Sequence, residues 1–220
     1  LDFMWAFDGV AHKPTETGLP FHDEAAKIDD TYLTGKIAYR GGHPFIEHFR
    51  FVQDLEDEKC VAKLTIPAPA QFFEQFAMPF NLEATRRYYK TDEELADDIV
   101  AAYRAFIADV YAVGCRNLQF DDCSWGMVVD PHAEQFFGVD AAGLERVKEA
   151  LLDVNNRALE GRPADLTVNT HVCRGNFHST WACEGGYDDV ADFLLARENV
   201  DAFFLEFDDA RSGGFEPLAK

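Results

Sequence analysis

The residues in this sequence most able to do chemistry are a histidine and a cysteine two positions apart, His171 and Cys173. On an extended segment, side chains two positions apart point to the same side, so both could reach one metal ion. Glu206 follows the next predicted strand, and imidazole, thiolate and carboxylate together suit zinc with one coordination position left open. The residue types alone leave an alternative, in which Cys173 is a small buried thiol and His171 a hydrogen-bonded core residue.

Other candidate groups also follow predicted strands. Asp121 and Asp122 come directly after one strand, and Asp208 lies two residues beyond Glu206. The carboxylate of Asp121 could bind a substrate ammonium group, or it could cap the loop after its strand. Trp125 lies nearby, where its ring could stack on a flat substrate or simply pack in the core. We therefore treat Asp121 and Trp125 as candidate substrate-binding residues.

The elements that must position these groups alternate between strands and helices. Short apolar runs predict the strands, while apolar residues at helical spacing and N-terminal caps predict the helices. We expect strands at 36–39, 61–66, 116–120, 166–170 and 202–205, helices at 43–57, 71–76, 91–113, 143–159 and 187–198, and an irregular stretch at 77–90. Repeated strand–helix–strand units indicate a parallel sheet with right-handed crossovers.

Such a chain forms either an open doubly wound sheet or a (β/α)8 barrel. The doubly wound alternative requires a glycine-rich phosphate loop, and neither G-x-G-x-x-G nor G-x-x-x-x-G-K occurs in the sequence. In a barrel the chemistry gathers at the carboxyl ends of the strands, where the candidate groups fall. We therefore predict an α/β fold, a (β/α)8 TIM barrel in a single domain over residues 1–220. Because only about five of the eight barrel strands are evident, we expect the barrel to be incomplete, with the first and last strand units missing.

The composition argues against several classes of partner. The sequence has 20 Lys and Arg against 40 Asp and Glu, a formal net charge of −20, which repels nucleic-acid phosphates and anionic lipid surfaces. No run of about 18 apolar residues occurs, so no membrane-spanning helix is expected. The five cysteines are interpreted as reduced thiols. We expect a cytoplasmic protein that binds neither nucleic acid nor membranes.

Three segments, in their order along the chain, resemble the catalytic domain of cobalamin-independent methionine synthase. They are 118–122 (Leu-Gln-Phe-Asp-Asp), 169–173 (Asn-Thr-His-Val-Cys) and 200–206 (Val-Asp-Ala-Phe-Phe-Leu-Glu). Segments 174–181 and 207–212 resemble those of the shorter, single-domain homologues of that enzyme. The resemblance runs from the start of the chain to about Leu218.

The resemblance implies a zinc ion bound by His171, Cys173 and Glu206 and by a second cysteine after the final barrel strand. That cysteine has no match, because no cysteine follows Glu206 in this sequence. The implied reaction moves a methyl group from 5-methyltetrahydrofolate, usually with a polyglutamate tail, to the thiol of homocysteine, which zinc holds as a thiolate. Asp121 matches the position that binds the amino group of the acceptor. The general acid that protonates the leaving amine is unassigned.

The sequence also departs from the family pattern. The D-E-P motif is replaced by Asp121-Asp122-Cys123, and Trp5 stands where methionine synthase has a second acceptor-binding glutamate. A related thiol or selenol acceptor is therefore compatible with the same zinc chemistry. Cys123 and Cys183 do not match ligand positions, and we interpret both as ordinary buried thiols.

Two alternative functions remain at this point. One is a uroporphyrinogen decarboxylase-like barrel enzyme, which the acidic composition disfavours because its substrate carries carboxylates. The other is a non-catalytic truncated homologue that acts through association with other subunits. The sequence leaves the oligomeric state open.

Overall fold

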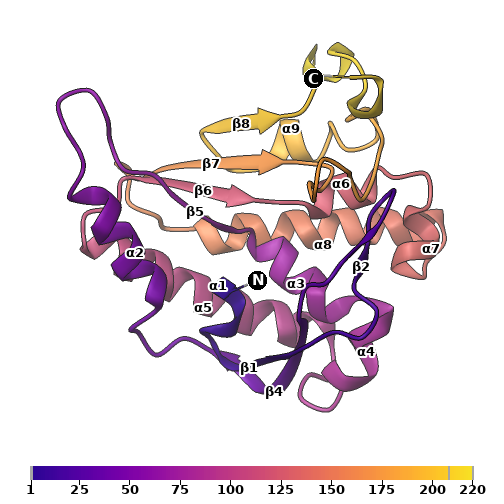
Figure 1. The fold of residues 1–220 in the computed structure, drawn as a ribbon, viewed down its shortest axis with the longest axis horizontal. Coiled ribbons are helices and arrows are strands. Elements are labelled where there is room, and N and C mark those ends of the chain that lie inside the picture. Colours follow the sequence, from indigo (N-terminus) through magenta and orange to yellow (C-terminus); the bar gives the residue numbers. More distant parts are fainter. Residues whose placement is uncertain (1, 208, 220) are drawn as a thin grey trace.

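The centre of the fold is a parallel sheet. The computed structural model describes residues 2–207 and 209–219 (Figure 1). Within these residues the sheet has four strands in the spatial order β5-β6-β7-β8, which is also their order along the chain. The strands are β5 (Leu64–Pro67), β6 (Asn117–Asp121), β7 (Thr167–Val172) and β8 (Ala202–Leu205). Each is followed by helical structure, so the predicted α/β class is confirmed.

The register of the sheet aligns the candidate residues. Pro67, Asp121 and His171 form one row across β5, β6 and β7, and Phe204 of β8 continues it. Because side chains alternate along a strand, the sheet has two different faces. Leu64, Ile66, Leu118, Phe120, Val168 and Val172 are buried on one face, and the other carries Thr65, Gln119, Asp121 and His171.

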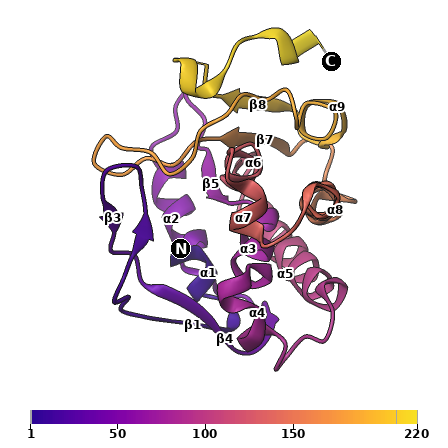
Figure 2. The same ribbon diagram turned by 90° about the vertical axis from the view of Figure 1, so that its right-hand side faces the viewer.

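Helices cover the apolar face of the sheet, as Figures 1 and 2 show. The long ones are α5 (Asp92–Ala112) and α8 (Ala141–Leu159), which pack on each other and on α3 (Pro69–Ala77). The others are α1 (Asp2–Trp5), α2 (Pro44–Gln53), α4 (Pro79–Thr85), α6 (Ser124–Val128), α7 (Ala133–Phe137) and α9 (Leu194–Arg197), with 3-10 turns at Ala210–Ser212 and Glu216–Ala219. A side-chain cap precedes each long helix. Thr91 Oγ1 accepts from Glu94 N (3.2 Å) at the start of α5, and Asp140 Oδ1 accepts from Gly143 N (2.7 Å) at the start of α8.

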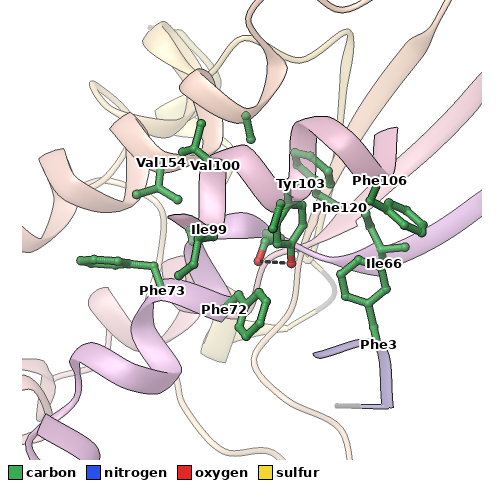
Figure 3. Close-up of a cluster of buried hydrophobic side chains, with 14 of the residues drawn as sticks. Phe3, Ile66, Phe72, Phe73, Ile99, Val100, Tyr103, Phe106, Phe120 and Val154 are labelled. Carbon is green, nitrogen blue, oxygen red and sulfur yellow. Dashed lines mark hydrogen bonds between the residues drawn. The ribbon is translucent and has the colours of Figure 1, made fainter. Parts of the chain in front are cut away.

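Aromatic side chains join the sheet, the helices and the N-terminus into one core. Figure 3 shows Phe72 of α3, Tyr103 of α5 and Phe120 of β6 in this cluster, together with Phe3. The buried Tyr103 hydroxyl donates to the carbonyl oxygens of Pro67 (2.9 Å) and Ala68 (3.2 Å). Tyr103 therefore fixes the end of β5 against α5 without leaving a buried polar group unpaired.

The N-terminal part differs from the prediction of a parallel strand at 36–39. Those residues continue from β4 (Asp30–Ala38), which pairs antiparallel with β1 (Asp8–Lys13). A second small hairpin joins β2 (Leu19–Pro20) to β3 (Ala25–Ala26). The short run at 36–39 predicted a strand correctly, but it does not identify the partner, whose paired residues here lie 17 to 30 positions upstream.

Two further segments differ from the sequence prediction. Residues 79–85 of the expected irregular stretch form α4, because Pro79 ends α3 and supplies the first turn of the next helix. Within 187–198 the structure has turns and only the short α9. Among the described residues, the helices lack the combination of length and apolarity needed to cross a bilayer.

Candidate active site

Cys173 and its two side-chain neighbours form the centre of the candidate site. Cys173 follows the end of β7, and its Sγ lies 3.1 Å from Sγ of Cys123, which follows β6. His171 hydrogen-bonds Cys173 through its side chain, while its Nδ1 donates to the carbonyl oxygen of Phe204 (3.0 Å). The backbone N–H of Gly175 also donates to the Cys173 sulfur (3.4 Å). The sulfur therefore sits among donors at the carboxyl ends of two adjacent strands, β6 and β7.

These contacts stabilise Cys173 as a thiolate. The hydrogen bond from Cys123, helped by those from His171 and Gly175, holds the pKa of Cys173 well below its usual range. The hydrogen bond with Cys173 raises the pKa of Cys123, and a hydrogen bond with Cys173 also raises the pKa of His171. Cys173 is thus the thiolate of the pair, which is the form that attacks electrophiles and binds metals.

Cys123 was missed as a site residue by the sequence analysis, which interpreted it as an ordinary buried thiol. In the structure it is partly exposed and in contact with Cys173. The register explains this position: Asp121 pairs with His171, and Cys123 and Cys173 each lie two residues further along. Asp-x-Cys at the end of β6 and His-x-Cys at the end of β7 have the same spacing, and this repeated spacing was the sequence signal that could have identified Cys123 as a site residue.

Gly126 brings Cys123 and Cys173 together. A Cβ atom at Gly126 would lie 2.3 Å from the carbonyl oxygen of Cys173, so no other residue lets α6 approach this closely. The same atom would lie 3.2 Å from Sγ of Cys183, a buried thiol whose pKa burial raises. Cys183 faces the carbonyl oxygen of Arg174 (3.5 Å).

The two aspartates after β6 occupy different environments. Asp121 is half-buried, accepts from Gln119 Nε2 (2.9 Å), and has its pKa raised by burial. Asp122 is fully buried and accepts from Ser124 Oγ (2.5 Å) and Asn155 Nδ2 (2.7 Å). Asp121 therefore remains available to a ligand, whereas Asp122 is part of the core.

Asp122 belongs to a buried group of three carboxyls, with Glu74 and Glu198. Asn155 donates to both Asp122 and Glu198, the latter at 3.1 Å. Burial, followed by repulsion from Asp122, raises the pKa of Glu74 to about 8 and that of Glu198 well above its usual range. Glu74 and Glu198 are thus favoured in their neutral, protonated forms.

Glu206 is held next to Cys173 by the backbone of Arg174 and the hydroxyl of Tyr187. Its Oε2 accepts from the backbone N–H of Arg174 (3.1 Å). The Tyr187 hydroxyl accepts from Glu206 N (3.0 Å) and lies 3.5 Å from the carbonyl oxygen of Val172. The fully buried Arg174 guanidinium lies over the Tyr187 ring (4.5 Å) and donates to Gly185 O. We call Arg174 and Tyr187 the clamp between the ends of β7 and β8.

The predicted zinc ligands are close but not assembled. Among the described residues, no three His, Cys, Asp or Glu side chains are arranged to hold a metal ion together. His171 contacts Cys173, and Glu206 reaches the backbone of the residue after Cys173. The donor chemistry of imidazole, thiolate and carboxylate fits zinc. Asp208, also singled out in the sequence, lies outside the described residues.

Neither the candidate Trp125 nor Trp181, in the segment after β7, offers an open stacking surface. Trp125 has no exposed surface and packs beside Glu198, so its predicted role toward a substrate stays a prediction. Trp181 is covered by the His22 ring, stacked at 4.5 Å, and by the Arg211 guanidinium at 5.0 Å.

Comparisons with known proteins give relatives of about twice this length. No protein-family model matches the chain. Two uncharacterised proteins of Bacillus subtilis (strain 168), YxjH and YxjG, are each 36% identical to it over 217 and 218 residues, 99% of the chain. The alignments cover 55% and 56% of those proteins, so the chain spans about half the length of the curated relatives it matches.

Solved structures extend the comparison. A protein from Listeria monocytogenes, provisionally assigned as a vitamin-B12-independent methionine synthase, is 31% identical with a TM-score of 0.66, over 94% of this chain and 52% of that one. The fold class is that of the TIM barrel. A B12-independent methionine synthase from Shewanella sp. W3-18-1, in complex with selenomethionine, has a TM-score of 0.58 at 17% identity. The alignment covers 96% of this chain and 55% of that one, and at this identity it supports the fold alone.

Proposed function

We propose that this chain carries the metal-binding half of a zinc-dependent methyltransferase. The methyl donor is 5-methyltetrahydrofolate, with a polyglutamate tail, and the acceptor is homocysteine or a related thiol. The observation that carries the proposal is that His171 and Cys173, at the end of β7, lie beside Glu206, at the end of β8, whose Oε2 accepts from the backbone N–H of Arg174 (3.1 Å). The likeness to the Listeria protein supports the same reaction class.

Each residue has a separate role in this proposal. His171, Cys173 and Glu206 would hold the zinc, which when bound keeps the acceptor sulfur in its reactive thiolate form. Asp121, half-buried in the row with His171, pairs with the ammonium group of the acceptor. The clamp keeps the Glu206 carboxylate beside Cys173. All five cysteines are unbridged in the described part, which is compatible with the reducing cytoplasm that we propose as its location.

Metal analysis of the full-length protein tests this function. We expect about one zinc per chain, loss of zinc in Cys173→Ser and His171→Ala, and retention in Cys60→Ser, whose thiol is exposed and outside the site. Incubation with methyltetrahydrofolate and a panel of thiols should give a methylated product that Cys173→Ser does not form. A folded wild-type protein that takes up no zinc, or that transfers methyl groups equally well without Cys173, contradicts the proposal.

A further inference from the structure

A second property of the candidate site concerns its two neighbouring sulfurs. We propose that Cys123 and Cys173 form a redox-active pair that closes into a disulfide when a peroxide reaches the site. The proposed function uses Cys173 alone and gives Cys123 no part. The pairing follows from the positions of the two side chains and does not require a bound metal.

The distance and exposure of the two thiols carry the proposal. Their sulfurs are 3.1 Å apart, and both residues are partly exposed, so a small oxidant can reach them. Among the other cysteines, Cys115 and Cys183 are buried and Cys60 is exposed on a different part of the chain. Cys183 is the nearest alternative, but its thiol faces the carbonyl oxygen of Arg174.

The backbone around the pair is suited to a disulfide. Neighbouring parallel strands lie about 4.8 Å apart, and disulfides bridge Cα atoms roughly 4.4–6.8 Å apart. Cys123 and Cys173 each come two residues after the last paired residues of β6 and β7, and the absence of a side chain at Gly126 permits their close approach. Bond formation therefore needs a small movement of side chains and no rearrangement of the sheet.

The contacts also assign the two chemical roles. The backbone N–H of Gly175 donates to the Cys173 sulfur (3.4 Å), so Cys173 is the attacking group. Its sulfur attacks one peroxide oxygen and the O–O bond breaks, giving a sulfenic acid and, after protonation, water. The Cys123 sulfur then displaces the sulfenic oxygen, which leaves as a second water with the Cys123 proton. The two sulfurs lose two electrons in total and the peroxide gains them.

The consequence for the proposed function is direct. A disulfide sulfur is not a zinc ligand, so oxidation removes Cys173 from the proposed metal site. Zinc bound at Cys173 should in turn slow oxidation, and peroxide should release the zinc. This consequence rests on the proposed function, whereas the disulfide itself does not.

The test uses reduced, metal-free full-length protein with Cys60→Ser as the background, which prevents disulfides between molecules. After hydrogen peroxide we expect an intact mass lower by two hydrogens and a peptide that links Cys123 to Cys173, both reversed by dithiothreitol. Cys183→Ser is the matched control and should form the same link. Cys123→Ser should form no link, and dimedone should trap a sulfenic acid on Cys173 in that variant.

Two outcomes would overturn the inference. One is that no disulfide forms and Cys173 proceeds to the sulfinic acid with Cys123 present, and the other is that Cys123 or Cys173 links to a different cysteine. Zinc analysis of the reduced protein separates this result from failure of the proposed function. Disulfide formation in a protein that never binds zinc would refute the methyltransferase and leave the redox pair intact. Zinc binding without disulfide formation would refute the redox pair and leave the methyltransferase intact.

Discussion

Glu74 illustrates how much a single buried residue can constrain the behaviour of this protein. Its side chain is 6% exposed, and its Oε2 has no hydrogen-bond partner in the described structure. Burial and the nearby Asp122 raise its pKa to about 8. The folded state therefore binds a proton at this residue at neutral pH, where the unfolded chain does not.

This difference predicts how Glu74 affects stability as pH changes. Because its folded pKa lies above its unfolded value of 4.5, its favourable contribution is complete below about pH 4.5 and is lost as the pH rises toward 8. Glu74→Gln mimics the protonated carboxyl, so we expect the variant to gain stability over the wild type by roughly 2–3 kcal/mol between pH 5 and pH 8. Urea unfolding at both pH values measures the change.

Glu83 provides a matched control for this substitution, because its side chain is 96% exposed. Glu83→Gln should leave the pH dependence of the free energy of unfolding unchanged. A Glu74→Gln variant whose stability relative to the wild type is the same at pH 5 and pH 8 would show that Glu74 is ionised in the folded protein.

At the scale of elements, the clamp links two strand ends that carry different predicted ligands. Tyr187 and Arg174 connect the backbone after β7 to Glu206 after β8. Tyr187 is fully buried, so its hydroxyl has no alternative partner in water. Groups that orient metal ligands in this way commonly affect metal affinity without touching the ion.

Tyr187→Phe tests this role. The substitution keeps the ring beneath Arg174 and removes the hydroxyl that accepts from Glu206 N. We expect zinc affinity to fall by roughly 10–100-fold and stability to fall by about 1–2 kcal/mol. Competition with a chromogenic chelator measures the affinity. Tyr111→Phe, which removes an exposed hydroxyl bonded to Asp165, should leave it unchanged, and an unaltered affinity in Tyr187→Phe would exclude the positioning role.

The sequence predicted the elements that local patterns determine. The parallel strands and the helices α5 and α8 were predicted because short apolar runs, helical spacing and caps are local signals. His171 and Cys173 were placed together for the same reason. The pairing of β1 with β4 and the contact between Cys123 and Cys173 depend on residues 17 to 50 positions apart, for which a single sequence carries no local signal.

At the scale of the whole molecule, the β2–β3 hairpin lies against the loop that follows β7 and the candidate site. Figure 2 shows the β2–β3 hairpin beside the segment after β7. His22 N donates to Trp181 O (2.7 Å), and the rings of Phe21 and Phe177 are 5.7 Å apart. The loop also contains His178 and Ser179 with φ of 50° and 67°, a conformation that non-glycine residues rarely adopt without support. The hairpin therefore helps to hold this loop in place.

Phe21→Ala should loosen the loop. We expect faster amide hydrogen exchange over residues 175–183, with little change in α5 and α8, because the contact is local to this part of the molecule. Mass spectrometry of exchanged peptides measures the effect. Leu19→Ala changes an exposed residue of the same hairpin and should not alter the exchange. Equal exchange in Phe21→Ala and wild type would mean that the loop holds its conformation without the hairpin.

The enclosure of Trp181 has an optical consequence. Its indole ring is stacked on the His22 imidazole and lies near the Arg211 guanidinium, so both groups shield it from water. Of the three tryptophans, Trp125 is shielded in the interior. The intrinsic fluorescence of the protein should therefore shift to longer wavelength when the β2–β3 hairpin lifts away and water reaches this ring, which makes Trp181 a built-in reporter of the contact between the hairpin and the loop after β7.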